Sequence, residues 1–434
     1  MSVSFALCFV ALFVLAGMGA PIALSMIGAA IVYLVVSGQD LSLAGEQIIQ
    51  GLYGSFVILA VPLFIIAGNL MNAGTVSERL LAFCNAIVGR FRGGLGHVNV
   101  VVNIILSGMS GSAVADAAAI GKVIIEMMTK DGRYPAGYAA AITAAAATIG
   151  PIIPPSIPMV LYSLISDASI GYLFLGGVVP GLLMGLVLML LNARAARTRN
   201  FPVEAPVPLR QVPRVTARAF PALLMPVILL YGIYGGVTTP TEGAALAAGY
   251  ALLLAGPIYR ALGWRGLYNV LSSSARQTAS IGIVIGGALI FNYIVAAENI
   301  PAHMAAYLEG LHLNPLAFLI VVNLILLFLG CLLDASTIIL VVLPLFIPSC
   351  RALGIDLVYF GVVAVVNCMI GLITPPYGVV LFVINGITGI PLSTIIREIW
   401  PFIGMLIVAL ILMILFPEIV LWLPQQFGYK GTVG

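Results

Sequence analysis

The chain has 434 residues, of which 62% are hydrophobic and 8% are charged, and its formal net charge at pH 7 is +3. Soluble domains carry about 25% charged residues, so this composition predicts a polytopic membrane protein and excludes a soluble enzyme or a nucleic-acid-binding domain. The five cysteines are scattered without metal-ligand spacing, and no Walker or zinc motif is present. We therefore expect no cofactor, no resident metal centre and no ATP-driven step in this chain.

The N-terminal part of the sequence is expected to form membrane spans and a polar arm. Residues 4–36 are apolar but too long for one untilted span, and Gly17, Gly19 and Pro21 indicate a break between two short helices. The next three segments are expected to be an interfacial stretch, a span and a polar arm, at 40–54, about 55–73 and 74–93.

A re-entrant hairpin is predicted at 94–130. Its two helices, expected at about 96–106 and 113–129, are each too short for the ~20 residues that a bilayer span needs. The residues between them, Ser107–Ser112, are mostly small or hydroxyl-bearing. Backbone exposed at membrane depth is tolerated only where protein or a wet cavity covers it, so the tip is a candidate ligand site.

An interrupted helix follows the hairpin. The apolar segment 136–166 contains Gly150–Ser156, which reads Gly-Pro-Ile-Ile-Pro-Pro-Ser. Proline lacks an N–H and disfavours helix at the residue before it, so the helix must unwind here. A span at 171–191 and a linker rich in arginine and proline at 192–219 complete the first half.

The second half predicts the same kinds of element. Its interrupted helix contains Thr374-Pro-Pro-Tyr-Gly378, and its hairpin has a polar tip near Gly330–Thr337. The expected elements are spans at about 220–236 and 241–257, an arm at 259–276, a span at 277–297, a hairpin at 313–351, an interrupted helix at 358–388 and a last span at about 399–423.

One sequence offset relates the two halves. It pairs Gly150 with Gly371, Pro154-Pro155 with Pro375-Pro376, Pro180 with Pro401, and Ser110 with Cys331. If the linker is cytoplasmic and each hairpin leaves the chain on its starting side, 15 of the 18 Lys and Arg residues lie on the cytoplasmic side. Arg351 and Lys430 lie on the other side, and Lys122 lies within the first hairpin. The halves are then inverted, and the first hairpin opens to the cytoplasm. We predict an all-α polytopic membrane protein of inverted repeats with two re-entrant hairpins and two interrupted helices.

This repeat gives a predicted division of the chain. The divisions are an N-terminal scaffold at 1–93, a first repeat core at 94–191, the linker at 192–219, a second scaffold at 220–312, a second repeat core at 313–423 and a tail at 424–434.

Two candidate Na⁺ sites follow from the chemistry of these breaks. Serine hydroxyls and carbonyl groups freed from an interrupted helix are hard oxygen donors that suit Na⁺. The first candidate site comprises Ser107, Ser110, Ser112, Gly150, Pro154 and Ser156. The second comprises Gly330, Asp334, Ser336, Thr337, Gly371, Thr374 and Pro375. Helix N-termini at the tips favour an anionic substrate. The candidate substrate residues are Ser110, Gly111, Ser112, Pro155, Ser336 and Pro376.

Several of these residues have a structural alternative. Small residues also serve tight helix packing in membranes, and Asp334 can fix the hairpin conformation instead of binding a cation. The role of Asp116, near the first tip, is open. Lys122 and Glu126 are expected to form a solvated pair. Asn69 and Asn72 either join helices, which we favour, or line a cavity. The three histidines, His97, His303 and His312, are expected at the interface rather than in a proton relay.

Three stretches resemble the large membrane subunit of tripartite ATP-independent periplasmic (TRAP) transporters. They are Ser110–Ala119, Gly150–Pro158 and Thr374–Gly378, and the resemblance covers essentially the whole chain. It implies a bacterial inner-membrane, Na⁺-coupled importer of an organic acid such as a C4-dicarboxylate or sugar acid, built as an elevator with a moving transport domain and a static scaffold. It also implies a small four-helix membrane subunit and a periplasmic substrate-binding protein as partners. One departure is Ala144–Ala147, where hydroxyl residues are expected.

Three alternative functions remain open from the sequence. The first is a stand-alone cation and carboxylate symporter without a binding protein, the second is a passive anion channel, and the third is a membrane-embedded enzyme. Two hairpins that open in opposite directions argue against a channel. An enzyme needs a convergent nucleophile and base at membrane depth, and none is apparent in the sequence.

Overall fold

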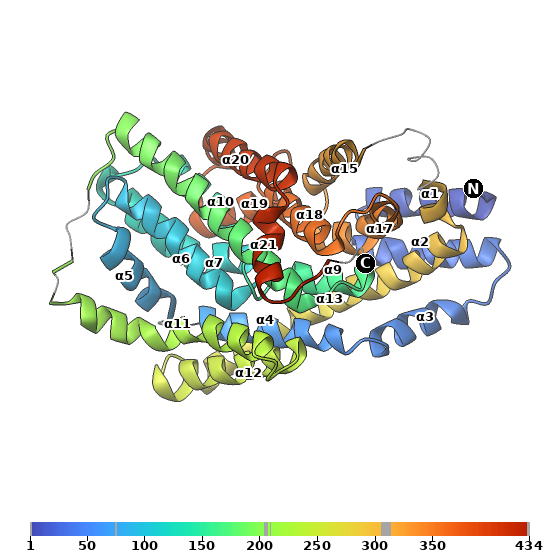
Figure 1. Cartoon of the computed structure of the whole chain (residues 1–434), viewed down its shortest axis with the longest axis horizontal. Helices are drawn as coiled ribbons and strands as arrows, with labels where there is room; N and C mark the ends of the chain where they lie inside the picture. The colour runs from blue at the N-terminus through green and yellow to red at the C-terminus, as the bar shows by residue number, and fades with distance from the viewer. Residues whose placement is uncertain (1, 74–75, 204–206, 209, 305–313, 432–434) are drawn as a thin grey trace.

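The computed structural model describes residues 2–73, 76–203, 207–208, 210–304 and 314–431. The described residues form helices, joined by short turns and one isolated β-bridge between Arg92 and Val203. Figure 1 shows the helices arranged along one long axis, with α1 to α3 near one end and α5 and α6 near the other.

The N-terminal scaffold confirms the predicted break in the first apolar run. Helices α1 (Val3–Gly17) and α2 (Ile22–Val36) pack against each other, and Gly19 turns the chain between them with φ of +89°. Such a φ is readily adopted only by glycine. Helix α3 (Ser42–Tyr53) is followed by a bend of 72° into η1 (Phe56–Leu59) and α4 (Ala60–Asn72). The predicted arm contains α5 (Val76–Val88).

The first repeat core contains the predicted hairpin and interrupted helix. The hairpin helices are α6 (Gly94–Ser110) and α7 (Ala113–Thr129), with 17 residues each, so the first is longer than predicted. A short 3₁₀ turn, η2 (Lys130–Gly132), leads to α8 (Ala136–Ala147), and α9 (Ile157–Ser166) lies beyond the break. The helix α10 (Ile170–Thr198) ends this core.

The second half repeats these elements. Its scaffold helices are α11 (Val212–Tyr234), α12 (Pro240–Leu253), which ends in the π-helical turn η3 (Leu254–Ile258), and α13 (Trp264–Ala297). Its hairpin consists of α15 (Pro315–Gly330) and a returning run of α16 (Ala335–Thr337), η4 (Ile338–Val342) and α17 (Leu343–Ala352). Its interrupted helix is α18 (Leu357–Gly371) and α19 (Val379–Thr388), and α20 (Leu392–Leu415) and α21 (Glu418–Gln426) follow.

Three predicted boundaries differ from the structure. The linker is shorter than 192–219, because α10 continues to Thr198 and α11 begins at Val212. The last predicted span, 399–423, is interrupted, because Pro417 separates α20 from α21. The predicted arm at 259–276 and span at 277–297 lie largely in one helix, α13, of 34 residues.

The continuity of α13 has a local cause in the sequence. The repeat offset places α13 opposite α3 and α4 together, so the bend between α3 and α4 has no counterpart. Gly54 and Ser55 occupy the bend, whereas Ala275 and Arg276 occupy the corresponding positions in α13. Glycine disfavours a helix interior by about 1 kcal/mol relative to alanine, so the second half continues where the first half turns.

The packing of the two halves follows the repeat. Helix α19 packs on α7 of the first hairpin, and α9 packs on the returning helix of the second; likewise α20 packs on α8, and α10 packs on α18. Tyr138 and Tyr359, one offset apart, each donate a hydrogen bond to the last long helix of their own half, to Asn192 Oδ1 at 2.9 Å and to the Ile414 carbonyl at 3.0 Å. These reciprocal contacts, with the matching element order, confirm the predicted repeat architecture.

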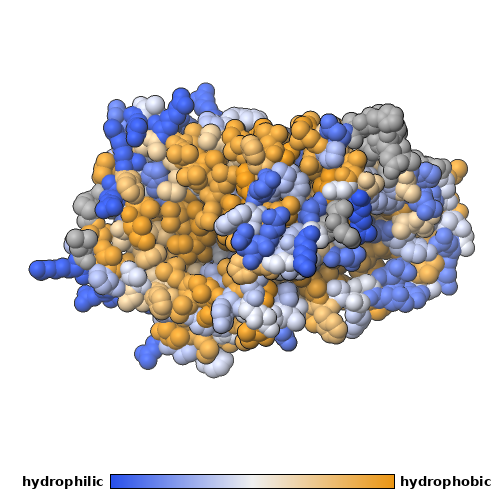
Figure 2. All heavy atoms as spheres, viewed as in Figure 1, coloured by the Kyte–Doolittle hydropathy of each residue, from blue (hydrophilic) through white to orange (hydrophobic). Residues whose placement is uncertain are grey.

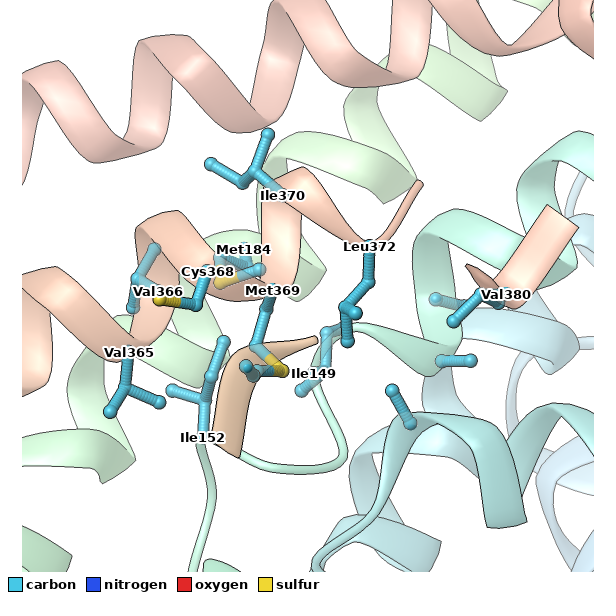
Figure 3. Packing of buried hydrophobic residues seen from close by; sticks show 14 of the residues in the cluster. Ile149, Ile152, Met184, Val365, Val366, Cys368, Met369, Ile370, Leu372 and Val380 are labelled. Carbon is cyan, nitrogen blue, oxygen red and sulfur yellow. The ribbon is translucent and has the colours of Figure 1, made fainter. Parts of the chain in front are cut away.

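The centre of the molecule is apolar where the two interrupted helices meet. Figure 3 shows Ile149 and Ile152, at the first break, beside Met369 near the end of α18 and Leu372 just after it. Ile149 and Ile152 are fully buried. The helix ends that flank the two breaks therefore share a hydrophobic core.

The surface and helix lengths suit a bilayer. Six described helices are long and apolar enough to cross a membrane, and a seventh span results if α3 with η1 and α4 counts as one. Figure 2 shows a broad hydrophobic expanse on one face, with hydrophilic residues gathered at the end where α10 stops and α11 starts in Figure 1. Trp264, Trp400 and Trp422 are all exposed, as expected of interfacial anchors.

The three histidines are not equivalent. His97 is buried near the start of α6, and its predicted position at the interface stays a prediction. His303 lies just after α13, and His312 falls outside the described residues.

The inverted orientation makes a labelling prediction. Cysteines introduced at Phe91 and Ala352, which are both exposed, are expected to react with an impermeant thiol reagent from opposite sides of the membrane. The native cysteines are unpaired, and all except Cys331 are buried, so a Cys331→Ser background is the control. Labelling of both positions from one common side would contradict the inversion.

Candidate functional site

The tip of the first hairpin is a tight turn between two helices. Gly111 ends α6 with φ of +62°, and a Cβ there would lie 2.5 Å from the Pro155 carbonyl oxygen. Ser112 is the N-cap of α7, where its side chain accepts a hydrogen bond from the Ala115 N–H at 3.4 Å. Glycine is therefore required at the tip both by its backbone conformation and by the close approach of the first break.

A buried carboxylate joins this tip to the interrupted helix. Asp116 is fully buried in the first turn of α7, and its Oδ1 accepts a hydrogen bond from the Ser110 hydroxyl. Its Oδ2 has no hydrogen-bond partner among the described residues. A Cβ on Gly150 would lie 2.3 Å from that oxygen. The tip hydroxyl, the carboxylate and the helix break thus meet at one point.

The break itself is held by its own polar groups. Ser156 is the N-cap of α9; its hydroxyl donates to the Pro151 carbonyl and accepts from the Met159 N–H at 3.2 Å. The Pro154-Pro155 bond is cis. Ser107 differs from the other predicted residues, because its hydroxyl donates to the Ile104 carbonyl of its own helix. The structure therefore brings Ser110 and Gly150 together through Asp116, whereas the Ser107 hydroxyl is bound within its own helix.

A cavity of about 640 Å³ lies beside the first tip. Ser110, Ser112 and small residues of α7 form one wall, and α4 and α13 form the other. Such a volume is typical of a small-molecule site. The polar residues on the scaffold wall are Asn69, Asn72, Gln277 and Ser280.

The position of Asn69 fits both of its predicted roles, which are to join helices and to line a cavity. Its Nδ2 donates to Ser274 Oγ at 2.9 Å and to Gln277 Oε1 at 3.2 Å, so it joins α4 to α13 as we favoured. It also lines the cavity, as does Asn72. The sequence alone leaves the role of Asp116 open and gives no sign of Gln277 or Ser280. The position of Asp116 in the first turn after the tip was the one available signal.

The second tip contacts the second break through two glycines. A Cβ on Gly371 would lie 2.6 Å from the Gly330 Cα, so the backbones of α15 and α18 touch directly. Thr374 Oγ1 donates to the Ile370 carbonyl at 2.7 Å, which fixes the threonine on its own helix end. The Pro375-Pro376 bond is cis, as in the first break.

Asp334 is the N-cap of the returning helix in the second hairpin. Its carboxylate accepts from the Thr337 N–H at 3.1 Å and from the Thr337 hydroxyl. Asp334 and Pro376 are exposed, and Ser336 is half-buried. This geometry supports the alternative in which Asp334 fixes the hairpin, and a cation role for it stays a prediction.

The two sites differ in what they offer a cation. The first holds a buried, incompletely paired carboxylate beside hydroxyl and carbonyl oxygens, which fits a small hard cation. The described residues contain no cluster of three His, Cys, Asp or Glu side chains that would hold a transition metal. The pair of Lys122 and Glu126, at 4.0 Å, is solvent-exposed as predicted and does not join the site.

The sequence comparisons agree with this architecture. Residues 9–419 match the tripartite ATP-independent periplasmic transporter, DctM component. The chain is 38% identical over 413 residues to the sialic acid TRAP transporter large permease protein SiaM of Vibrio cholerae, covering 95% of this chain and 96% of that protein. It is 41% identical over 373 residues to the C4-dicarboxylate TRAP transporter large permease protein DctM of Pseudomonas aeruginosa, covering 86% and 87%.

A solved structure shares the fold. The YdaH transporter of Alcanivorax borkumensis, described as having an unusual topology, superposes with a TM-score of 0.63 at 17% identity, covering 86% of this chain and 88% of that one. Fold, hairpin tips and relatives together define a multi-pass transporter permease of the bacterial inner membrane. The chain belongs to the DctM family, the large permease component of TRAP transporters.

Proposed function

We propose that this permease imports a small organic acid by Na⁺-coupled, elevator-type transport, working with a small four-helix membrane subunit and a periplasmic binding protein that delivers the acid. The observation that carries the proposal is the cluster of Ser110, Asp116 and Gly150 next to the large cavity. A cation bound at Asp116 neutralises the carboxylate and so permits an anion to occupy the neighbouring cavity.

The cargo class rests on the cavity and on the relatives. A volume of about 640 Å³ accommodates a molecule of the size of a dicarboxylate or a sugar acid. Relatives are named for sialic acid, for C4-dicarboxylates and, in Escherichia coli, for 2,3-diketo-L-gulonate. All three are organic acids, and the same class is proposed here.

The elevator motion is proposed from how the parts contact each other. The repeat cores interlock through α8 with α20 and α10 with α18, which favours their movement as one body. The scaffold helix α4 meets the first tip through Gly68, where a Cβ would lie 2.8 Å from the Ser110 Cα. Small residues at this contact allow the two helices to approach closely without interlocking side chains, which is compatible with a sliding contact.

Uptake by the reconstituted complex tests the proposal. Proteoliposomes that contain this chain and its small subunit, with a cargo-loaded binding protein outside, are expected to accumulate the acid only when Na⁺ is higher outside. Succinate, sialic acid and 2,3-diketo-L-gulonate are the first cargoes to test. Uptake that persists without Na⁺ would reject the coupling. Uptake without the binding protein would favour a stand-alone symporter, and single-channel currents would favour a passive channel.

A further inference from the structure

The scaffold wall of the cavity contains a hydrogen-bond chain with a fixed direction. Ser274 Oγ donates its proton to the Val270 carbonyl at 2.8 Å, so its oxygen acts as the acceptor for Asn69 Nδ2 at 2.9 Å. The same Nδ2 donates its other hydrogen to Gln277 Oε1 at 3.2 Å. The carboxamide of Gln277 is thereby oriented with its oxygen toward Asn69, and its Nε2 is left to donate elsewhere.

Gln277 is placed to donate into the cavity. It is exposed and lines the cavity, and no described residue accepts a hydrogen bond from its Nε2. An amide N–H₂ without a protein acceptor binds water or an oxygen atom of a ligand. The direction of the chain therefore makes this part of the wall a donor surface.

A second carboxamide on the same wall lacks partners. Asn72 lines the cavity, and neither its Oδ1 nor its Nδ2 has a hydrogen-bond partner among the described residues, although both atoms are enclosed. An enclosed amide without hydrogen-bond partners is destabilising. The last side-chain torsion of asparagine is soft, so the amide reorients at little cost. A small rotation toward the cavity would let a ligand oxygen accept a hydrogen bond from its Nδ2.

The charges of the residues that line the cavity limit how it can bind a ligand. None of the described residues that line it is lysine or arginine. An organic anion in this cavity is therefore met by neutral donors, the hydroxyl of Ser112 on the hairpin side and the carboxamides on the scaffold side, because the hydroxyl proton of Ser110 is already donated to Asp116. Neutral donors hold a carboxylate less strongly than an arginine pair does, which suits a site from which cargo must leave.

We propose that Gln277 binds a carboxylate oxygen of the cargo from the scaffold side of the cavity, that Asn72 supplies a second donor, and that Asn69 and Ser274 are positioning residues for Gln277. This inference rests on the proposed function, because it takes the cargo to be an organic acid. It assigns cargo recognition to the scaffold as well as to the hairpin.

The Gln277→Glu variant tests the role of Gln277 with little disturbance of the helix contact. Its carboxylate still accepts from Asn69 Nδ2, but it replaces the cavity-facing donor with a negatively charged acceptor. We expect the KM for cargo in the reconstituted complex to rise about tenfold or more, with an unchanged Na⁺ dependence. Gln277→Met, which removes the donor without adding charge, is expected to have a smaller effect in the same direction.

The matched control is Gln47→Glu, the same change on α3 outside the cavity lining. It is expected to leave the KM for cargo unchanged. Ser274→Ala removes a positioning residue, so a moderate rise in KM is expected without a change in the maximal rate. Wild-type KM in both Gln277 variants would overturn the proposal.

A readout without cargo separates this proposal from the transport function. In a Cys331→Ser background, Ser280→Cys places a thiol on the same exposed wall. An anionic and a cationic methanethiosulfonate are compared for their rates of reaction with it. Gln277→Glu is expected to lower the ratio of anionic to cationic rate several-fold, even if none of the tested acids is transported. An unchanged ratio would contradict the donor wall, whereas a lowered ratio without Na⁺-driven uptake would contradict only the transport proposal.

Discussion

Replacement of Asp116 by asparagine is expected to reduce Na⁺-driven uptake by about 100-fold or more, while the protein still folds. Asparagine keeps an oxygen that accepts from Ser110, so the tip retains its hydrogen bond. The change removes the negative charge and turns the unpartnered Oδ2 position into a donor. Loss of one member of a buried charge pair costs about 3–5 kcal/mol, which corresponds to a loss of affinity for Na⁺ of more than 100-fold.

Two measurements separate a cation role from a structural one. The first is uptake into proteoliposomes across an imposed Na⁺ gradient; the second is the thermal stabilisation of the purified protein by Na⁺, which a bound cation produces by mass action. Glu126→Gln is the matched control, because Glu126 lies on the same helix but its side chain is exposed. Na⁺ stabilisation and uptake at wild-type levels in Asp116→Asn would show that the carboxylate serves packing alone.

Most of the architecture could be predicted from the sequence because proline and glycine set it locally. The breaks at Gly150–Ser156 and Thr374–Gly378 follow from missing N–H groups and from the restriction that proline imposes on the preceding residue. Helix ends that lack such residues are harder to predict from the sequence. The end of α10 lies beyond the predicted span, because the segment around Arg194 and Arg197 continues the helix into the hydrophilic end of the molecule.

The candidate sites were predictable only in part, because sequence indicates which polar groups are near a break but not which groups meet. Ser110 and Gly150 were selected for their chemistry, and the structure joins them through Asp116. Gln277 could not be found, since its role depends on a contact between α4 and α13 that are distant in sequence. Ser107 has the predicted hydroxyl, but this hydroxyl forms its hydrogen bond within its own helix.

A large effect on uptake is also expected from a change at the contact between Gly330 and Gly371 in the second site. Gly371→Ala is expected to reduce Na⁺-driven uptake at least tenfold. The added Cβ would lie 2.6 Å from the Gly330 Cα and 2.7 Å from the Gly330 carbonyl carbon. Because these are backbone atoms, no side-chain rotation relieves the overlap, and the tip of the second hairpin must move away from the break. Overpacking of this kind typically costs about 1–3 kcal/mol of stability, so the protein is expected to fold with a displaced site.

The control for this change is Gly386→Ala on α19, where an added Cβ meets nothing within 4 Å. Alanine favours helix over glycine, so Gly386→Ala is expected to be neutral or slightly stabilising. The informative quantity is the Na⁺ concentration for half-maximal uptake. If the second tip and break form a cation site together, Gly371→Ala raises this concentration, whereas a purely structural defect lowers the amount of active protein and leaves it unchanged. Wild-type uptake at wild-type Na⁺ dependence would show that the close approach of Gly330 and Gly371 serves packing and that coupling depends on the first site.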